Sequence, residues 1–229
     1  MTTYFQRELE KIKKEILSLG ALVEERFRES ANAVKTNNTT LARSIIERDI
    51  EIDTYEIEIE EECLKLMALY QPVATDLRFL IAVIKINNDL ERIGDLCSNI
   101  SRRLITASTD MPLSYDYDYS YMAKKTARMF KMSLDSLVTT DIDTAYKVLD
   151  MDKEINLMRN SAFGSMKKAI KKRPDQVGNI INRYLISRHI ERIGDHTTNI
   201  AEEVIHLVEG EIIRHKNKEY IKVHKNGNI

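Results

Sequence analysis

The stretch QPVATDLRFLIAVIKINNDLERIGDLCSNISRRL (71–104) decides the fold, because its apolar residues recur at alternating intervals of three and four. That spacing places them on one side of an α-helix, as a seam that packs against other helices. The seam consists of Phe79, Val83, Ile86, Leu90, Ile93, Cys97, Ile100 and Leu104. Each side chain of this kind contributes roughly 1.5–3 kcal/mol when it is buried. The stretch therefore predicts a long helix within a helical bundle.

The motif at the centre of this stretch returns a hundred residues later. LERIGDLCSNI (90–100) and IERIGDHTTNI (190–200) match at seven of eleven positions. Upstream, residues 33–53 resemble residues 136–156 at a spacing of 103. Two blocks that recur in the same order at nearly the same offset indicate an internal duplication.

The three prolines agree with this division of the chain. Pro72 and Pro174 each separate two long helical patterns, at equivalent corners of the two repeats. Pro112 lies in TASTDMPLSYDYDYSY (106–121), which lacks helical periodicity and is the best candidate for a linker. Three helices are expected in each repeat, at 4–36, 39–70 and 73–107, and at 116–139, 141–172 and 175–209.

The composition favours an all-α fold. Among 229 residues there are only seven Gly and three Pro, too few for the many tight turns of a β-sandwich, a barrel or a doubly wound fold. We therefore predict two tandem three-helix bundles with six long antiparallel helices. The expected parts are a first repeat at 1–108, a linker at 109–115, a second repeat at 116–212 and a basic, flexible tail at 213–229.

Charge and hydropathy exclude several functions. The 35 basic and 36 acidic side chains give a formal net charge of −1, which argues against a nucleic-acid binder that relies on bulk positive charge. The two cysteines do not suggest a disulfide scaffold. The sequence shows neither a signal peptide nor an apolar run of the roughly 18 residues that a membrane span requires. We therefore expect a soluble, cytoplasmic protein.

Rows of acidic residues are the main functional signal. Glu91, Asp95 and Asn99 are four residues apart and form one row on their helix, turned away from the apolar seam. The second repeat has the same row in Glu191, Asp195 and Asn199. The helix expected at 39–70 carries an acidic stripe of Asp49, Asp53, Glu56 and Glu60. If these helices pack antiparallel, the facing carboxylates would favour a hard or borderline cation.

Other interpretations stay open at this point. An acidic row is more often a solvated helix face, and a structural scaffold without metal is one alternative. A carboxylate-bridged metalloenzyme is another, but it needs two Glu-x-x-His motifs, whereas Glu203 and His206 form a single one that we interpret as helix surface. No nucleophile elbow, Walker loop or zinc-protease motif occurs, so we do not expect an enzyme. Gly94 and Gly194 lie inside the predicted helices and suggest close approach of a neighbouring helix.

The chain resembles the PhoU family of phosphate-uptake regulators. The resemblance rests on residues 71–100, on the repeated HIERIGDHTTNIAEEV (189–204) and on the closing EVIHLVEG (203–210), and it extends over about 5–212. It implies a non-enzymatic regulator that restrains the phosphate-starvation response. It also implies an adaptor between the ATPase subunit of the phosphate ABC transporter and a phosphate-sensing histidine kinase, and a homodimer.

The resemblance further implies multinuclear iron or zinc, or another divalent cation, and no organic cofactor. Some members of the family bind such metals through acidic motifs on the bundle faces. The matching pairs in this sequence are Asp49 with Asp53, Glu91 with Asp95, Glu191 with Asp195, and Asp152 with Asn156. The amide of Asn156 departs from the acidic pattern, so the second site is expected to be the weaker one.

Overall fold

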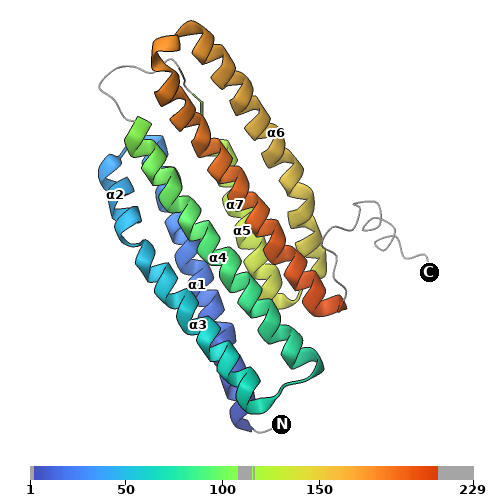
Figure 1. The fold of residues 1–229 in the computed structure, drawn as a ribbon. Coiled ribbons are helices and arrows are strands. Elements are labelled where there is room, and N and C mark those ends of the chain that lie inside the picture. Colours follow the sequence, from blue (N-terminus) through green and yellow to red (C-terminus); the bar gives the residue numbers. More distant parts are fainter. Residues whose placement is uncertain (1–2, 108–114, 116, 211–229) are drawn as a thin grey trace, which may run out of the picture.

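The fold is all-α, with two three-helix repeats in tandem, as predicted (Figure 1). The structure is a computed structural model, and it describes residues 3–107, 115 and 117–210. The helices are α1 (Thr3–Thr36), α2 (Thr39–Glu47), α3 (Asp49–Tyr70), α4 (Ala74–Ala107), α5 (Ser120–Thr139), α6 (Ile142–Lys172) and α7 (Val177–Glu209), with a 3₁₀ turn at Pro174–Gln176 before α7. All six expected helices are present, the second being divided into α2 and α3.

The two helices that carry the duplicated motif lie side by side in the middle of the molecule. Figure 1 shows α4 and α7 together at the front, with α2 and α3 on one flank, α6 on the other, and α1 and α5 behind. The most extensive packing of α4 is against α7, a helix of the other repeat. The duplicated repeats are therefore joined along their equivalent helices.

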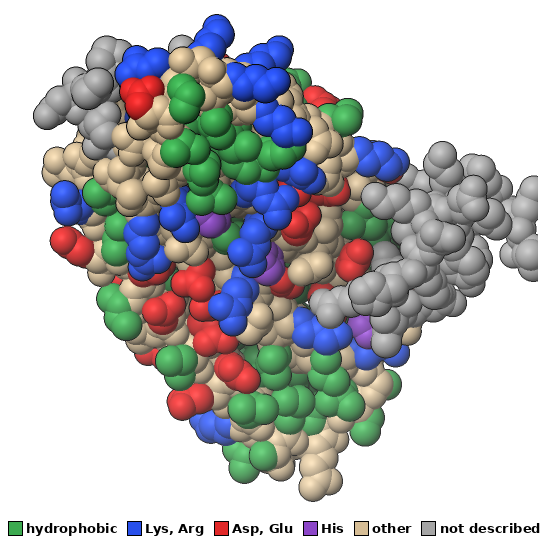
Figure 2. Space-filling view, turned by 45° about the horizontal axis from the view of Figure 1, so that its top comes forward, with side chains coloured by type: hydrophobic (Ala, Val, Ile, Leu, Met, Phe, Trp, Pro, Cys, Tyr) green, Lys and Arg blue, Asp and Glu red, His purple; other side chains and the backbone are tan. Residues whose placement is uncertain are grey.

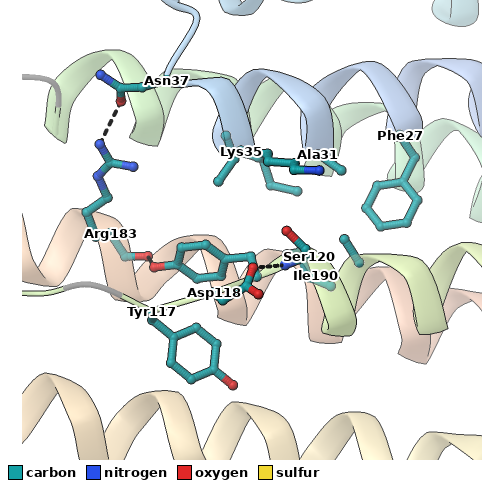
Figure 3. A pocket seen from close by; sticks show the side chains of 13 residues that line it. Phe27, Ala31, Lys35, Asn37, Tyr117, Asp118, Ser120, Arg183 and Ile190 are labelled. Atoms are coloured by element: carbon teal, nitrogen blue, oxygen red, sulfur yellow. Dashed lines mark hydrogen bonds between the residues drawn. The ribbon is translucent and has the colours of Figure 1, made fainter.

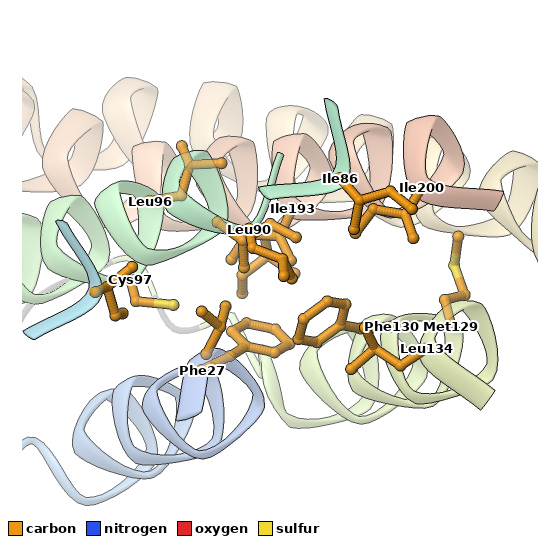
Figure 4. Close-up of a cluster of buried hydrophobic side chains, with 14 of the residues drawn as sticks. Phe27, Ile86, Leu90, Leu96, Cys97, Met129, Phe130, Leu134, Ile193 and Ile200 are labelled. Carbon is orange, nitrogen blue, oxygen red and sulfur yellow. The ribbon is translucent and has the colours of Figure 1, made fainter. Parts of the chain in front are cut away.

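The apolar core runs through both repeats without a break. Phe27 of α1, Leu90 of α4, Phe130 of α5 and Ile193 of α7 point toward one another between the helices (Figure 4). All the predicted seam residues of α4 are buried except Phe79, which is partly buried and packs on the core. The heptad pattern of residues 71–104 thus correctly predicted which face of α4 is buried.

One predicted seam position in α3 is wrong. The intervals of three, four and seven residues between Leu41, Ile45, Ile52, Tyr55, Ile59 and Leu66 predict Leu69 as the next position of the apolar seam of helix 39–70, but 65% of its surface is exposed. In the last turn of α3, Tyr70 instead points toward α1, and the centroid of its ring lies 5.1 Å from that of Phe5. Since Tyr70 covers the start of α1, Leu69 falls on the solvent side.

The predicted helix 39–70 is interrupted at Arg48. Its backbone (φ −90°, ψ 7°) closes α2 and opens α3. The Arg48 side chain donates to the Ser44 carbonyl from Nε (3.3 Å) and to Glu29 of α1 from Nη2 (2.8 Å). We attribute the break to these tertiary contacts, because no Gly or Pro marks it in the sequence.

The first helix of the second repeat begins at Ser120 rather than at 116. Before it, tyrosines reach back to carbonyl groups of other helices. The Tyr117 hydroxyl donates to Met158 of α6 at 2.9 Å, and the Tyr119 hydroxyl donates to Arg183 of α7 at 2.5 Å. These bonds hold the segment in a non-helical conformation. The predicted linker apart from Tyr115, and the predicted tail at 213–229, lie outside the described residues.

Replacing each of the two motif glycines, Gly94 and Gly194, with alanine should affect the free energy of unfolding differently. A Cβ on Gly94 would lie 2.8 Å from Cδ1 and 3.2 Å from Cγ2 of Ile52, whereas a Cβ on Gly194 would be 3.7 Å from its nearest neighbour, in Ile155. Gly194→Ala should therefore raise the free energy of unfolding by up to about 1 kcal/mol, the helix-propensity gain. Gly94→Ala should show no gain, because overpacking costs about 1–3 kcal/mol. Urea denaturation of both variants measures this, and equal gains would contradict the close approach of α3 to α4.

Candidate metal centre

Five carboxylates of α3 and α4 form what we call the first acidic cluster. Its members are Asp49, Asp53 and Glu56 of α3, with Glu91 and Asp95 of α4. The contact of Ile52 with Gly94 brings the two helices together at this point. On the face formed by α3, α4, α6 and α7, acidic side chains gather in the middle, below a group of Lys and Arg side chains (Figure 2). The antiparallel packing that the sequence suggested therefore places both acidic rows together.

The first acidic cluster is electrostatically strained. Burial raises the pKa of Glu91, and the nearby carboxylates, Asp95 above all, raise it further. Burial likewise raises the pKa of Asp49 and of Glu56, with added repulsion from Asp53 at Asp49 and from Glu60 and Asp53 at Glu56. Carboxyl groups in such a cluster hold protons more tightly than in water because their charges are not fully compensated. A bound cation would relieve the same repulsion.

Arginine compensates this cluster only in part. Arg92 lies at 3.4 Å from both Glu91 and Asp95, and half of its side chain is exposed. Exposed ion pairs of this kind contribute little, about 0–1 kcal/mol. The cluster therefore keeps a net negative charge on partly buried oxygen atoms, the donor set that hard and borderline divalent cations prefer.

The second acidic cluster contains Asp152 and Asn156 of α6, with Glu191 and Asp195 of α7. Asn156 Nδ2 donates to Asp152 at 2.8 Å. Although solvent reaches Asp195, burial on its protein side and the charges of Glu191 and Asp152 raise its pKa to about 6. The structure thus also brings these four predicted residues together.

Two arginines change the chemistry of the second cluster. Arg159 of α6 lies 3.2 Å from Glu191, and Arg188 of α7 lies 3.1 Å from it. Glu191 was expected on an outward face, but only 5% of it is exposed, because α6 packs over this side of α7. Sequence reasoning missed both arginines. The spacing of 103 residues between the repeats could have identified Arg159, because it aligns Arg159 with Glu56 of the first repeat.

The chemistry of the first acidic cluster suits a cation better than that of the second. Within the described ranges, no three Asp, Glu, His or Cys side chains are already arranged at metal-binding geometry. In the first cluster, the donor set and its uncompensated charge suit a cation. In the second, an amide donates to Asp152 and two guanidinium groups pair with Glu191, which leaves fewer uncompensated carboxylates for a metal than in the first.

The seam between α4 and α7 contains further polar pairs. Glu203, interpreted from sequence as helix surface, is only 2% exposed and bonds to Lys85 of α4 at 3.2 Å. Asp89 of α4 lies 2.8 Å from His196 Nδ1 and accepts from Asn199 at 3.0 Å. These residues bind the two repeats to each other, so Glu203 lies in the contact between α4 and α7 and not on the helix surface.

These features define a tandem helical-bundle protein with clusters of carboxylates on its helix faces. None of the helices in the described ranges is long and apolar enough to cross a membrane. The sequence pattern of the PhoU domain matches twice, at residues 16–104 and 120–204, one match in each repeat. The chain therefore belongs to the PhoU family, whose members are non-enzymatic accessory and regulatory proteins of phosphate transport.

Relatives cover almost the whole chain. A phosphate-specific transport system accessory protein PhoU homolog of Pseudomonas aeruginosa is 34% identical over 92% of this chain and 88% of its own length. The crystal structure of PhoU from Pseudomonas aeruginosa matches with a TM-score of 0.85 and 33% identity, over 90% of this chain and all of that one. The phosphate transport system regulatory protein PhoU of Streptococcus pneumoniae matches with a TM-score of 0.82 and 28% identity, over 91% of this chain and 98% of that one.

The arginines of the two clusters should differ in their effect on stability. Arg159→Ala leaves the buried Glu191 with one cation fewer and should lower the free energy of unfolding by about 1–3 kcal/mol. The matched change Arg92→Ala removes an exposed partner and should cost less than about 1 kcal/mol. Urea denaturation at neutral pH with a chelator present compares the two variants. Equal losses would show that the second cluster is not held by its arginines.

Proposed function

We propose that this chain is a negative regulator of the phosphate-starvation response and of phosphate uptake. The observation that carries the proposal is the match of both repeats to phosphate-transport accessory proteins over nine-tenths of the chain. The protein acts as an adaptor in the cytoplasm, between the ATPase subunit of the phosphate ABC transporter and a phosphate-sensing histidine kinase. It meets the membrane only through these partners, and it functions as a homodimer.

The packing of the two repeats suits an adaptor. Because α4 and α7 share one core and several polar pairs, the acidic faces of both repeats keep a fixed spacing. A rigid protein of this kind transmits a signal when a partner in one state binds it more tightly than the same partner in another state. The state of the transporter then determines whether the adaptor is available to restrain the kinase.

Metal binding is proposed for the first acidic cluster. Asp49, Asp53, Glu91 and Asp95 would hold iron, zinc or another divalent cation, with Glu56 beside them. The metal would supply positive charge where burial and mutual repulsion already raise the pKa of Asp49 and Glu91. The equivalent cluster of the second repeat would contribute little, because Arg159 and Arg188 neutralise Glu191.

Matched double variants test this assignment. Glu91→Gln with Asp95→Asn removes two ligands of the first acidic cluster, and should abolish most of the metal bound by protein purified without chelator. Glu191→Gln with Asp195→Asn removes the same groups from the second cluster, and should leave metal content nearly unchanged. Elemental analysis per chain is the readout. Equal losses in the two variants would contradict the restriction to the first repeat, and no loss in the first would remove the metal assignment altogether.

Deletion of the gene tests the regulatory proposal. Cells that lack the protein should express phosphate-starvation genes in high phosphate, because the kinase is no longer restrained. Transcript levels in high and low phosphate measure the effect, and a plasmid copy of the gene should restore repression. Normal repression in the deletion strain would refute the proposed function, whatever the metal content of the protein.

A further inference from the structure

A second surface lies away from the acidic faces, between the first helices of the two repeats. α1 and α5 run antiparallel behind α4 and α7 (Figure 1), and a groove of about 540 Å³ lies between them. Each helix lines it with a stripe of residues at intervals of three and four, from Glu24 to Lys35 on α1 and from Ser120 to Lys131 on α5. Eleven steps of 1.5 Å make each stripe about 16 Å long, or three helical turns. The groove therefore has the length and the parallel walls that a third helix needs.

The floor of the groove is apolar and mostly small. Phe27 is buried at its base, and Ala31, Ala123 and Ala127 lie along the two walls. Alanine side chains allow another backbone to approach closely, and the buried Phe27 ring closes the base of the groove beneath them. Such a floor suits the apolar face of an amphipathic helix.

The rim of the groove is strongly cationic. Its lining contains five basic side chains and one carboxylate, Glu24, which is paired with Arg28. The other four, Lys35, Lys124, Arg128 and Lys131, are exposed and form no ion pair among the described residues. The whole chain has a formal net charge of only −1, so this concentration of positive charge is local. It is complementary to an acidic ligand.

One end of the groove deepens into a cavity of about 330 Å³ at the junction of the repeats. Figure 3 shows Lys35 of α1 and Arg183 of α7 on its walls, with Arg183 Nη2 donating to Asn37 Oδ1 at 2.7 Å. Asp118 lies beside them and accepts from the backbone N–H of Ser120 at 2.8 Å. Beyond Lys35, which also lines the groove, this end thus offers one further cationic group, Arg183, in reach of an acidic residue at the end of a docked helix.

We propose that the groove between α1 and α5 binds an amphipathic helix of a partner protein, with small or aliphatic residues on one face and Asp or Glu on both flanks. The apolar floor and the cationic rim extend along three turns, which is longer than a small anion would use. The site is independent of the acidic clusters and of the proposed metal, so it adds a second recognition surface on another part of the molecule.

A peptide pair tests the site directly on the full chain. The probe is a fluorescein-labelled 18-residue helix with Leu and Ala on one face and Glu on its flanks, and the comparison peptide has Lys at every Glu. Fluorescence anisotropy should show binding of the Glu peptide, weakened by salt, and at least about tenfold weaker binding of the Lys peptide. Absence of binding by the Glu peptide, or equal binding of both, would overturn the proposal.

Matched variants locate the binding. Lys124→Glu, Arg128→Glu and Lys131→Glu together should weaken binding of the Glu peptide by about tenfold or more. The control triple Lys168→Glu, Lys171→Glu and Lys172→Glu changes the net charge equally on an exposed part of α6, and should leave affinity within about twofold. Equal losses in both triples would overturn the proposal.

A floor variant separates docking from general attraction between charges. Ala127→Trp fills the groove without changing its charge and should also abolish binding, whereas unchanged binding would show that the floor is not used. Circular dichroism checks that each variant folds. A different outcome is that the unsubstituted protein self-associates, that the variant with Lys124→Glu, Arg128→Glu and Lys131→Glu does not, and that the peptide does not bind. The groove would then be occupied by a second copy of this chain, and the proposal would be wrong.

Discussion

The packing of α4 against α7 is the constraint on which the rest of the structure depends. These equivalent helices run antiparallel, and polar pairs follow their contact from one end to the other: Lys85 with Glu203, Asp89 with His196, and Arg103 with Asn182. Most of these groups are partly or fully buried, so separating the helices would expose apolar surface and leave polar groups without partners. Because the same two helices carry the duplicated acidic motif, their packing also determines that both acidic clusters lie on one side of the molecule.

The duplicated repeats share the same backbone fold, but substitutions have made their acidic clusters chemically different. Asp53 and Glu56 in the first repeat correspond to Asn156 and Arg159 in the second. The first cluster is left with uncompensated carboxylates, and in the second Glu191 is held between two guanidinium groups. The proposed cation would therefore bind at only one of two nearly equivalent sites, and the two acidic faces would differ in charge. The basic groove between α1 and α5 adds a third surface of opposite charge.

The spacing of apolar residues along the sequence predicted the helices and their buried faces. The features that it did not predict arise from contacts between segments that lie far apart in the sequence. The interval of three and four in residues 71–104 gave the buried face of α4, and the repeat at ERIGD gave the second bundle. The acidic pairs on α3 and α4 were also brought together as expected. The break at Arg48 arises from its contact with Glu29, which no local signal marks. The burial of Glu191 depends on Arg159, which lies 32 residues away in sequence, and the groove exists only because α1 and α5 of different repeats meet.

The most direct measurement of the central claim is whether the two repeats unfold together. The chain has no tryptophan, so Tyr55→Trp in α3 and Phe163→Trp in α6, made separately, would each report on one repeat. Urea unfolding is then followed by fluorescence and by circular dichroism in both variants. If the packing of α4 against α7 unites the repeats, all probes show a single transition with the same midpoint and slope. Separate transitions for the two tryptophans would contradict a shared core and a rigid adaptor.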